Sequence, residues 1–389
     1  MNSSRQTINF LTGGSGFLGS HIGAELLRRG QDTFFLVRNH SKKEPRERLE
    51  KVLDWHGIDH RIRSKAHLVK GSLADLGSIS NATGLPRIDR VIHCASDTSF
   101  SERWRERIWH TNVENLMCLL DFVDQKKIPA FIHVSTAYAA GKKIGRCLEK
   151  PPENNRFFNA YEESKAAAER ILLERARKMD VDVTILRPSI VYGHSQTGRT
   201  FRFNALYYPI KAVLFLKKVF VEDIKRKGGM KAAAAGVSVE ACGSTDLPLR
   251  IDADESSGIN LIPVDFFVDA FFAVAEDSVS TGIYHIVNPV QTRIADIVDY
   301  IQEQFRLKGI RTCPPQEFQR IPRNLLERLF ESYLQAYSPY MKDQRRFTTK
   351  RMEPVLKRRG LVCPPFDADM CRRCMAYADK NGWSAAGLT

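Results

Sequence analysis

The chain has 389 residues, of which 43% are hydrophobic and 27% charged, so it can form a sizeable core and about two domains of ~100–200 residues each. Its formal net charge of +14 favours acidic partners, but no zinc-finger or RNP-type motif indicates nucleic-acid binding, and a solvated basic surface is the simpler interpretation. No run of 18 apolar residues and no leader before the first predicted strand occur, so we expect a cytoplasmic protein without a membrane span.

Short apolar runs alternate with amphipathic stretches through the first half of the chain. The predicted strands are 7–12, 33–38, 67–71, 90–95, 130–135 and 182–187, and the predicted helices are 17–29, 43–55, 103–127 and 159–179. Such alternation is typical of a parallel sheet with helices on both faces. We therefore predict an α/β fold with a Rossmann-type doubly wound parallel sheet.

The alternation ends after residue 193. The following stretches predict helices over 194–231, a loose loop over 232–248, a strand–helix pair over 259–276, a strand over 282–288, a helix over 293–306 and a basic, largely helical C-terminal part. We assign 1–193 to the domain of the parallel sheet, to which 259–276 returns. The ranges 194–258 and 277–389 are assigned to a smaller, mostly helical substrate lobe.

A glycine-rich turn, TGGSGFLG, follows the first predicted strand and opens the first predicted helix. In this context Gly13 can form the tight turn, Gly16 lets the backbone approach a pyrophosphate, and Gly19 lets the helix pack closely on the sheet. The exposed amide groups and the positive end of the helix then favour phosphates. The turn predicts a dinucleotide site; the alternative is a helix start whose glycines serve packing only.

The second predicted strand ends in Arg38, at the place where an acidic residue would hold the ribose 2′-hydroxyl of NAD. No acidic residue follows until Glu44. A guanidinium suits a 2′-phosphate through charge-assisted hydrogen bonds, and Arg48 either assists it from the next helix or is simply exposed. We therefore predict NADPH rather than NADH as the cofactor.

Tyr161 and Lys165 stand four residues apart in a predicted helix, so both side chains lie on one face. A free tyrosine has a pKa of about 10 and is a poor acid at neutral pH, whereas a nearby ammonium stabilises the phenolate and lowers that pKa. The pair predicts an acid–base site, the alternative being an exposed helical pair. Ser135 and Thr136 follow the fifth predicted strand, where a hydroxyl can share the negative charge that develops on a substrate oxygen.

Eight cysteines are scattered along the chain, and only Cys371 and Cys374 form a C-x-x-C pair. No second pair or histidine cluster accompanies them. Two core-facing free thiols on a helix are therefore favoured over a zinc or redox site, and we predict no metal.

The sequence resembles the extended short-chain dehydrogenases/reductases in the motifs TGGSGFLG, HCAS, TNVENL, STAYAAG, YEESK, RPSIVYG and NLIPVDFFVDA. Within that superfamily it is most similar to the thioester reductase and fatty acyl-CoA reductase (male-sterility-like) branch. That similarity is carried by HVSTAYAAG, FNAYEESKAAAE, RPSIVYGHSQTG and the closing PPFDADMCRRCMAYADKNGW. The resemblance covers nearly the whole chain.

The resemblance implies roles for residues that match the family's motifs. Thr136, Tyr161 and Lys165 match the catalytic triad, and Ser135 ranks second to Thr136. The further positions implied for the cofactor are Phe17, Leu18, Leu73, Cys94, Ala95, Ser135, Lys165, Pro188, Ile190 and Val191. The family often has Gly-Asp after the third strand, where Gly71-Ser72 stands here. Ser72 can still accept a hydrogen bond from an amino group, and the role of nearby Asp75 stays open.

The implied reaction is the NADPH-dependent reduction of an acyl thioester to an aldehyde, with a second reduction to the alcohol left open. The acyl group would arrive on phosphopantetheine, from coenzyme A or an acyl or peptidyl carrier protein. Because both donors are acidic, we expect Lys217, Lys218 and the basic cluster at 345–359 to be docking residues. The apolar stretch at 201–220 either lines an acyl tunnel or belongs to the core of the lobe.

Two other functions stay open from the sequence. An extended reductase, epimerase or dehydratase acting on a nucleotide sugar or hydroxy-ketone would use the same triad, although Arg38 argues against the NAD that such epimerases usually bind. A non-catalytic NADPH sensor would be expected to lack the tyrosine or the lysine, and both are present. The oligomeric state is open as well; the resemblance suggests a homodimer through the helices at 103–127 and 159–179.

Overall fold

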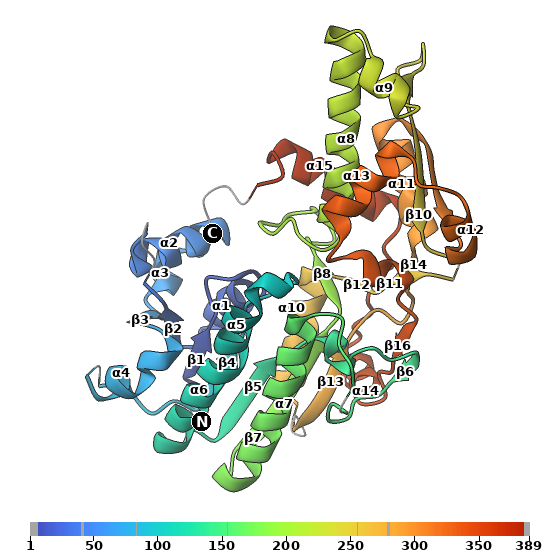
Figure 1. Cartoon of the computed structure of the whole chain (residues 1–389). Helices are drawn as coiled ribbons and strands as arrows, with labels where there is room; N and C mark the ends of the chain where they lie inside the picture. Colours follow the sequence, from blue (N-terminus) through green and yellow to red (C-terminus); the bar gives the residue numbers. More distant parts are fainter. Residues whose placement is uncertain are drawn as a thin grey trace.

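The computed structural model describes residues 7–39, 43–82, 84–153, 155–254, 256–277 and 281–384. The residues before the first predicted strand, 1–6, lie outside these ranges. The framework is a seven-stranded parallel sheet in the order β13-β7-β5-β4-β1-β2-β3 (Figure 1). Its strands are β1 (Asn9–Thr12), β2 (Thr33–Val37), β3 (Ala66–Lys70), β4 (Arg90–His93), β5 (Ala130–Val134), β7 (Asp182–Pro188) and β13 (Gly282–Ile286).

Helices cover both faces of this sheet. Phe10 and Leu11 are neighbours on β1 and are both fully buried, yet they belong to two different hydrophobic clusters. Successive side chains on a strand point to opposite faces, so each face has its own core. The core on the Leu11 side includes α1 (Phe17–Arg28), α10 (Val264–Ala275) and α14 (Met352–Arg358), and the core on the Phe10 side includes α6 (Asn115–Gln125) and α7 (Ala160–Met179). This architecture confirms the predicted Rossmann-type fold.

The last strand of the sheet comes from the C-terminal half of the chain. Gly282–Ile286, which we assigned to the lobe within 277–389, pairs in parallel with β7 along its whole length. Met352 and Val355 of α14 also pack into the core of the sheet. The C-terminal range therefore supplies elements both to the lobe and to the sheet.

The helix predicted over 103–127 is divided into parts. α5 (Arg105–Trp109) is followed by a π-helical turn, η3 (His110–Glu114), and then by α6. The buried Asn112 amide lies in this turn and donates to the Ser164 hydroxyl at 2.9 Å and to the Asp97 carbonyl at 3.0 Å. A wider turn of this kind re-aims a side chain without ending the helix. The division thus follows from tertiary bonds that the local pattern does not encode.

The second hydrophobic body of the molecule is a lobe of helices and a small sheet, seen beside the main sheet with α8 projecting beyond it (Figure 1). Its larger helices are α8 (Tyr207–Arg226), α11 (Ile294–Phe305), α13 (Leu325–Leu334) and α15 (Ala368–Lys380). Its three-stranded sheet has the order β15-β10-β9, with β9 (Ser238–Val239), β10 (Thr245–Asp252) and β15 (Leu307–Cys313). Cys371 and Cys374 are buried free thiols in the lobe core, as predicted.

The loose loop predicted over 232–248 is wrong in part, because α9 (Met230–Ala234) reaches into this range and β9 and the start of β10 lie within it. Leu247, Leu249 and Ile251 of β10 alternate with more exposed residues, which is the pattern of a half-buried strand. Pro248 obscured that pattern, since proline cannot donate to a neighbouring strand. The pairing with β15 shifts register between Asp246 and Leu249, which accommodates the proline.

The remaining elements are short. They are α2 (Pro45–Trp55), α3 (His60–Arg63), α4 (Leu76–Ala82), α9 (Met230–Ala234), α12 (Pro315–Arg320), η1 (Leu73–Asp75), η2 (Glu102–Trp104), η4 (Ala137–Ala140), η5 (Ser338–Lys342), β6 (Gly145–Cys147), β8 (Ile190–Tyr192), β11 (Gly258–Ile259), β12 (Leu261–Pro263), β14 (Thr292–Arg293) and β16 (Arg345–Phe347). The strand–helix pair expected over 259–276 is present as β12 and α10. Within the described part of the chain, no helix combines the length and apolar character needed to cross a bilayer.

Candidate active site

The glycine-rich turn between β1 and α1 presents bare backbone at a helix N-terminus. Gly13 has a φ of +73°, and a Cβ atom there would lie 2.5 Å from the backbone nitrogen of Ala95. A Cβ atom at Gly19 would lie 2.3 Å from the Gly13 carbonyl oxygen, so a larger residue would push α1 away from the turn. Gly16 is the N-cap of α1, and its amide donates to the Gly13 carbonyl. This arrangement suits a pyrophosphate group.

A groove of about 560 Å³ opens beside this turn, past the C-terminal ends of β1 to β4. Eight of the predicted cofactor residues line it: Gly13, Gly16, Arg38, Arg48, Ser72, Leu73, Cys94 and Ala95. Burial raises the pKa of the Cys94 thiol to about 12, so this side chain is a neutral wall at physiological pH. Ser72 donates to Asp75 at 2.6 Å. Its hydroxyl oxygen keeps acceptor capacity for an amino group.

Three cationic side chains, Arg38, Lys43 and Arg48, line one end of the groove. The Arg48 guanidinium donates to the Arg38 carbonyl at 2.9 Å and to the Ser15 hydroxyl at 3.2 Å. Partial burial and the charge of Arg38 lower the pKa of Arg48, which means that two guanidinium groups are held close together. An anion relieves such repulsion, so this end of the groove fits a 2′-phosphate.

The other predicted cofactor residues do not line the groove. They are Phe17, Leu18, Gly19, Ser135, Lys165, Pro188, Ile190 and Val191. Gly19 lies beneath the turn, and the ring of Phe17 packs edge-on against Phe201 with centroids 5.5 Å apart. Ile190 lines a separate apolar cavity. Contact of these residues with a cofactor stays a prediction.

Tyr161 lies in the first turn of α7, directly after the N-cap residue Asn159 and Ala160. Burial raises the pKa of the Tyr161 phenol to about 12, a hydrogen bond with Thr136 lowers it in part, and the charge of Glu162 raises it. The sequence predicted that Lys165 would lower this pKa. In the structure burial raises the pKa of Tyr161 instead. The Lys165 ammonium is engaged elsewhere, by the Val134 carbonyl.

Lys165 is buried one turn further along α7. Its ammonium donates to the Val134 carbonyl at 2.8 Å and lies 3.5 Å from Nε2 of His133. Burial lowers the pKa of Lys165 to about 8, while the carboxylate of Glu169 raises it in part. The side chain is therefore a cation at neutral pH that loses its charge only slightly above it.

Ser135 and Thr136 point to different partners. The Ser135 hydroxyl donates to the buried carboxylate of Glu169, which also forms an ion pair with Arg187, with Nε 2.9 Å from Oε1. Thr136 instead bonds Tyr161 and accepts from the amide of Tyr138 at 3.3 Å. The placement of the two hydroxyls favours Thr136 over Ser135 as the partner of the phenol.

Two buried features next to these residues were missed from the sequence. Asn112 anchors the loop after β4 to α7 through Ser164 and Asp97. His93 and His133 are register partners on β4 and β5, with their rings stacked 5.3 Å apart. Burial lowers the pKa of His93 to about 3 and that of His133 well below its usual value, so both are neutral. The motif TNVENL was the only sequence signal, for Asn112.

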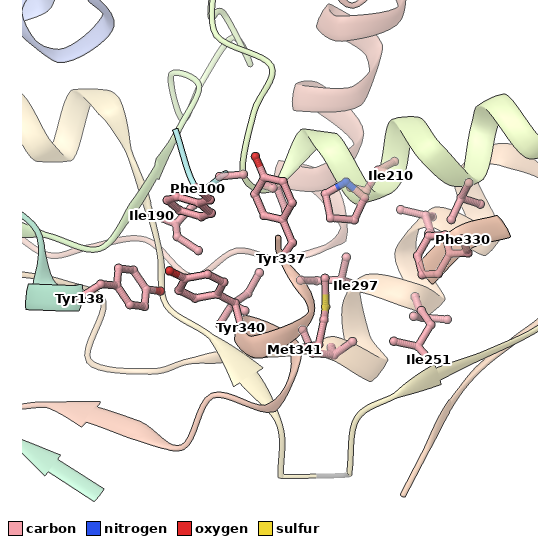
Figure 2. Close-up of a pocket in the computed structure, with 18 residues that line it drawn as sticks. Phe100, Tyr138, Ile190, Ile210, Ile251, Ile297, Phe330, Tyr337, Tyr340 and Met341 are labelled. Carbon is pink, nitrogen blue, oxygen red and sulfur yellow. The ribbon is translucent and has the colours of Figure 1, made fainter. Parts of the chain in front are cut away.

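An apolar cavity of about 90 Å³ lies between the sheet and the lobe (Figure 2). Tyr138, Phe100, Ile190 and Tyr340 gather at one end, and Ile251 and Phe330 lie at the other. The first end adjoins the candidate catalytic residues, because the rings of Phe100 and Tyr161 have centroids 5.6 Å apart.

The lining of this cavity is hydrophobic or aromatic throughout. The Tyr340 hydroxyl is occupied by Glu162 and Asn159, and the Tyr337 hydroxyl is hydrogen-bonded to the backbone of Ala205. Ile210 and Val213 of α8 belong to the lining, so part of the stretch 201–220 borders a cavity. A cavity with so apolar a lining suits a hydrocarbon chain.

The basic residues expected to dock a partner differ in their exposure to solvent. Lys218, Arg346 and Lys350 are exposed, whereas the Lys217 ammonium donates to the Phe305 carbonyl at 2.7 Å. Arg345 is completely buried, so its assignment to a docking surface is wrong. The carboxylates of Glu162 and Asp343 hold it inside the protein.

Residues 11–271 match the family described as male sterility protein. Fatty acyl-CoA reductase 1 of Xenopus laevis is 27% identical over 221 residues, which are 46% of this chain and 42% of that relative. This chain thus spans less than half the length of that relative.

The solved structure of the terminal R domain from the myxalamid PKS-NRPS biosynthetic pathway matches with a TM-score of 0.75 and 21% identity, over 98% of this chain and 93% of that one. The UDP-glucuronic acid 4-epimerase of Bacillus cereus, solved with UDP-glucuronic acid and NAD, matches with a TM-score of 0.63 and 17% identity, over 96% and 100%. At these identities the two structures show a shared fold. Because the family match covers more than half of the chain, the protein belongs to the male sterility protein family of NAD(P)-binding domains, within the extended short-chain dehydrogenase/reductase superfamily.

Proposed function

We propose that this protein is an NADPH-dependent oxidoreductase that reduces acyl thioesters whose acyl group is a hydrocarbon chain. The apolar cavity that begins beside Tyr161 carries the proposal. A chain placed there would put its carbonyl end at Tyr161 and Thr136 and its apolar end in the lobe. The relative named fatty acyl-CoA reductase supports the same class of substrate.

Arg38, Lys43 and Arg48 would hold the 2′-phosphate of NADPH, and Gly13 and Gly16 its pyrophosphate. When bound, the reduced nicotinamide supplies the hydride to the thioester carbonyl carbon. The carbonyl oxygen then gains negative charge, and the Thr136 hydroxyl is placed to share it. Tyr161 and Lys165 are proposed to supply a proton and a positive charge.

Tyr161 is the proposed acid. With a pKa of about 12 its phenol stays protonated at neutral pH and can give its proton to the new oxyanion, which forms a hemithioacetal. Collapse of the hemithioacetal breaks the carbon–sulfur bond and releases an aldehyde and a thiol. The overall balance is one thioester, one NADPH and one proton consumed for one aldehyde, one thiol and one NADP⁺ formed. Lys165 supplies a buried positive charge one turn further along α7, where its ammonium is held by the Val134 carbonyl.

A nucleotide-sugar epimerase or dehydratase would share the fold and the triad. Its sugar hydroxyls would need many polar partners, whereas the cavity beside Tyr161 is lined by apolar side chains and three tyrosines. The hydrocarbon substrate therefore fits this site better.

The test is to mix the protein with NADPH and matched acyl thioesters of coenzyme A and of a phosphopantetheinylated carrier protein. We expect oxidation of NADPH with equal release of free thiol, detected by a thiol reagent, and an aldehyde or alcohol by mass spectrometry. Tyr161→Phe should bind NADPH normally and release no thiol. NADPH oxidation without thiol release, or turnover of UDP-sugars, would reject the proposal. The two donor arms also separate coenzyme A from a carrier protein.

A further inference from the structure

A buried arginine from the C-terminal part of the chain lies under the start of α7. Arg345 belongs to β16, which pairs in parallel with β6, and it is fully buried. Its guanidinium lies 3.1 Å from Oε1 of Glu162 and 2.8 Å from Oδ1 of Asp343, and it donates to the Gly141 carbonyl at 3.1 Å. Every one of these contacts joins segments that are far apart in the sequence, except that with Asp343.

The carboxylate that Arg345 meets belongs to the residue directly after Tyr161. Glu162 is also fully buried, and it accepts from the Tyr340 hydroxyl at 2.9 Å and from the Phe158 amide at 3.1 Å. Asn159, the N-cap of α7, donates to the same Tyr340 hydroxyl at 2.8 Å. The first turn of α7, which carries Tyr161, is thus held by a closed network of charged and polar groups.

The same arginine contacts the wall of the apolar cavity. Its guanidinium lies 4.5 Å from the ring centroid of Tyr138 and 5.7 Å from that of Tyr340, and both tyrosines line the cavity (Figure 2). Phe100 joins the two ends of this arrangement, with its ring centroid 5.2 Å from Tyr340 and 5.6 Å from Tyr161. The Arg345 side chain therefore links the cavity wall to the turn that carries Tyr161, the proposed acid.

We propose that Arg345 is a positioning residue that fixes Tyr161 relative to the acyl group. The inference rests on the proposed function, because it assigns Tyr161 the role of acid. A buried ion pair is in general weak evidence for stability, since apolar residues of similar volume often replace it at no cost. The geometry gives this pair another role: it sets where the first turn of α7 lies against the cavity wall.

A second consequence concerns charge. The carboxylate of Glu162 raises the pKa of Tyr161, while Thr136 lowers it and Lys165 lies one turn away on the same helix. Arg345 neutralises that carboxylate within hydrogen-bonding distance. Loss of Arg345 alone would leave Glu162 buried and unpaired beside the phenol. Loss of both charges would remove the unpaired carboxylate beside the phenol, while Asp343, the other partner of Arg345, would stay buried without its cation.

The experiment compares Arg345→Met, the double variant Glu162→Gln/Arg345→Met, and Arg311→Met as an exposed control that breaks only a surface ion pair with Glu317. We expect Arg345→Met to lose both thermal stability and kcat. The double variant should regain part of the melting temperature, yet keep kcat about 10- to 100-fold below that of the parent protein, because a small misplacement of a reacting group is costly. NADPH binding should change less than about twofold in every variant. Recovery of kcat together with stability in the double variant would overturn the proposal and leave Arg345 a purely structural residue.

A readout independent of turnover keeps the inference separate from the proposed function. NMR of tyrosine-labelled protein, with the Tyr161 signal assigned by Tyr161→Phe, should show a displaced Tyr161 ring in the double variant and an unchanged one in Arg311→Met. If the parent protein reduces no acyl thioester, the proposed function fails, and the NMR comparison still decides whether Arg345 positions Tyr161. An unmoved ring in the double variant would contradict the inference even in an active enzyme.

Discussion

At the scale of single residues, the proposed preference for NADPH rests on the pair Arg38 and Arg48. Each guanidinium can form charge-assisted hydrogen bonds to a 2′-phosphate, and bonds to charged groups contribute about 1.5–3 kcal/mol. We expect Arg38→Ala to raise KM for NADPH about 10- to 100-fold and to leave KM for NADH nearly unchanged. Steady-state kinetics with both cofactors measures this. Arg46 is an exposed arginine on α2, the helix of Arg48, and Arg46→Ala should alter neither KM. Equal losses with both cofactors in Arg38→Ala would contradict the assignment.

The buried ammonium of Lys165 predicts a pH dependence. Its pKa is lowered to about 8, so the charge is present below that pH and is lost as the pH rises through it. Tyr161, with a pKa of about 12, cannot produce a change in that range. We therefore expect kcat/KM to fall above pH about 8, as measured across a buffer series at constant ionic strength. A profile that stays level up to the pKa of an ordinary lysine, about 10.4, would show that Lys165 keeps its proton or is not required.

At the scale of elements, the π-helical turn η3 holds the loop after β4 against α7 through one side chain. Asn112 donates to Ser164 and to the Asp97 carbonyl and accepts from the Asp97 amide. Asn112→Ala removes these hydrogen bonds between buried and half-buried groups, each of which contributes about 0.5–1.5 kcal/mol, although Ser164 still donates to the Tyr161 carbonyl. We expect a total loss of about 2–5 kcal/mol in the free energy of unfolding, measured by denaturant titration. Glu114→Ala removes only a surface contact with His110 and should stay within about 0.5 kcal/mol of the parent.

The sequence predicts an element well where its signal is local. The six N-terminal strands of the sheet follow from apolar runs between amphipathic stretches, and the turn at Gly13 follows from its spacing. It predicts poorly where a tertiary bond overrides the local pattern. Pro248 hides β10 until the register shift against β15 is seen, and nothing local at Asn112 indicates a wider helical turn.

At the scale of the whole molecule, some residues of the candidate site could be predicted from local motifs and others could not. Tyr161, Lys165 and Thr136 belong to short motifs, so their places on α7 and after β5 could be predicted. Arg345 stands in a basic stretch that suggests an exposed surface, and only the pairing of β16 with β6 brings it under α7. Residues whose role depends on contacts across 180 or more positions leave no such mark in a single sequence.

Under the proposed function, the cavity between the sheet and the lobe limits the length of the acyl chain. Its volume of about 90 Å³ is small, and Phe330 on α13 closes the end away from Tyr161 (Figure 2). If the proposed function holds, Phe330→Leu should lengthen the cavity and favour longer chains, because each buried methylene contributes about 0.8 kcal/mol. We expect the ratio of kcat/KM for a substrate two carbons longer to that for the parent's preferred substrate to rise about tenfold.

Phe220 on α8 provides the matched control for this prediction, since it is buried in the same lobe core but does not line the cavity. Phe220→Leu removes the same volume from the lobe core and should lower the melting temperature by a similar amount, because both substitutions leave a void of the same size. It should leave the chain-length profile where it was. A profile that moves equally in both variants would mean that general loosening of the lobe, rather than the blind end at Phe330, sets the length of the chain. A profile that moves in neither would place the acyl group outside this cavity, and the hydrocarbon substrate would lose its physical basis.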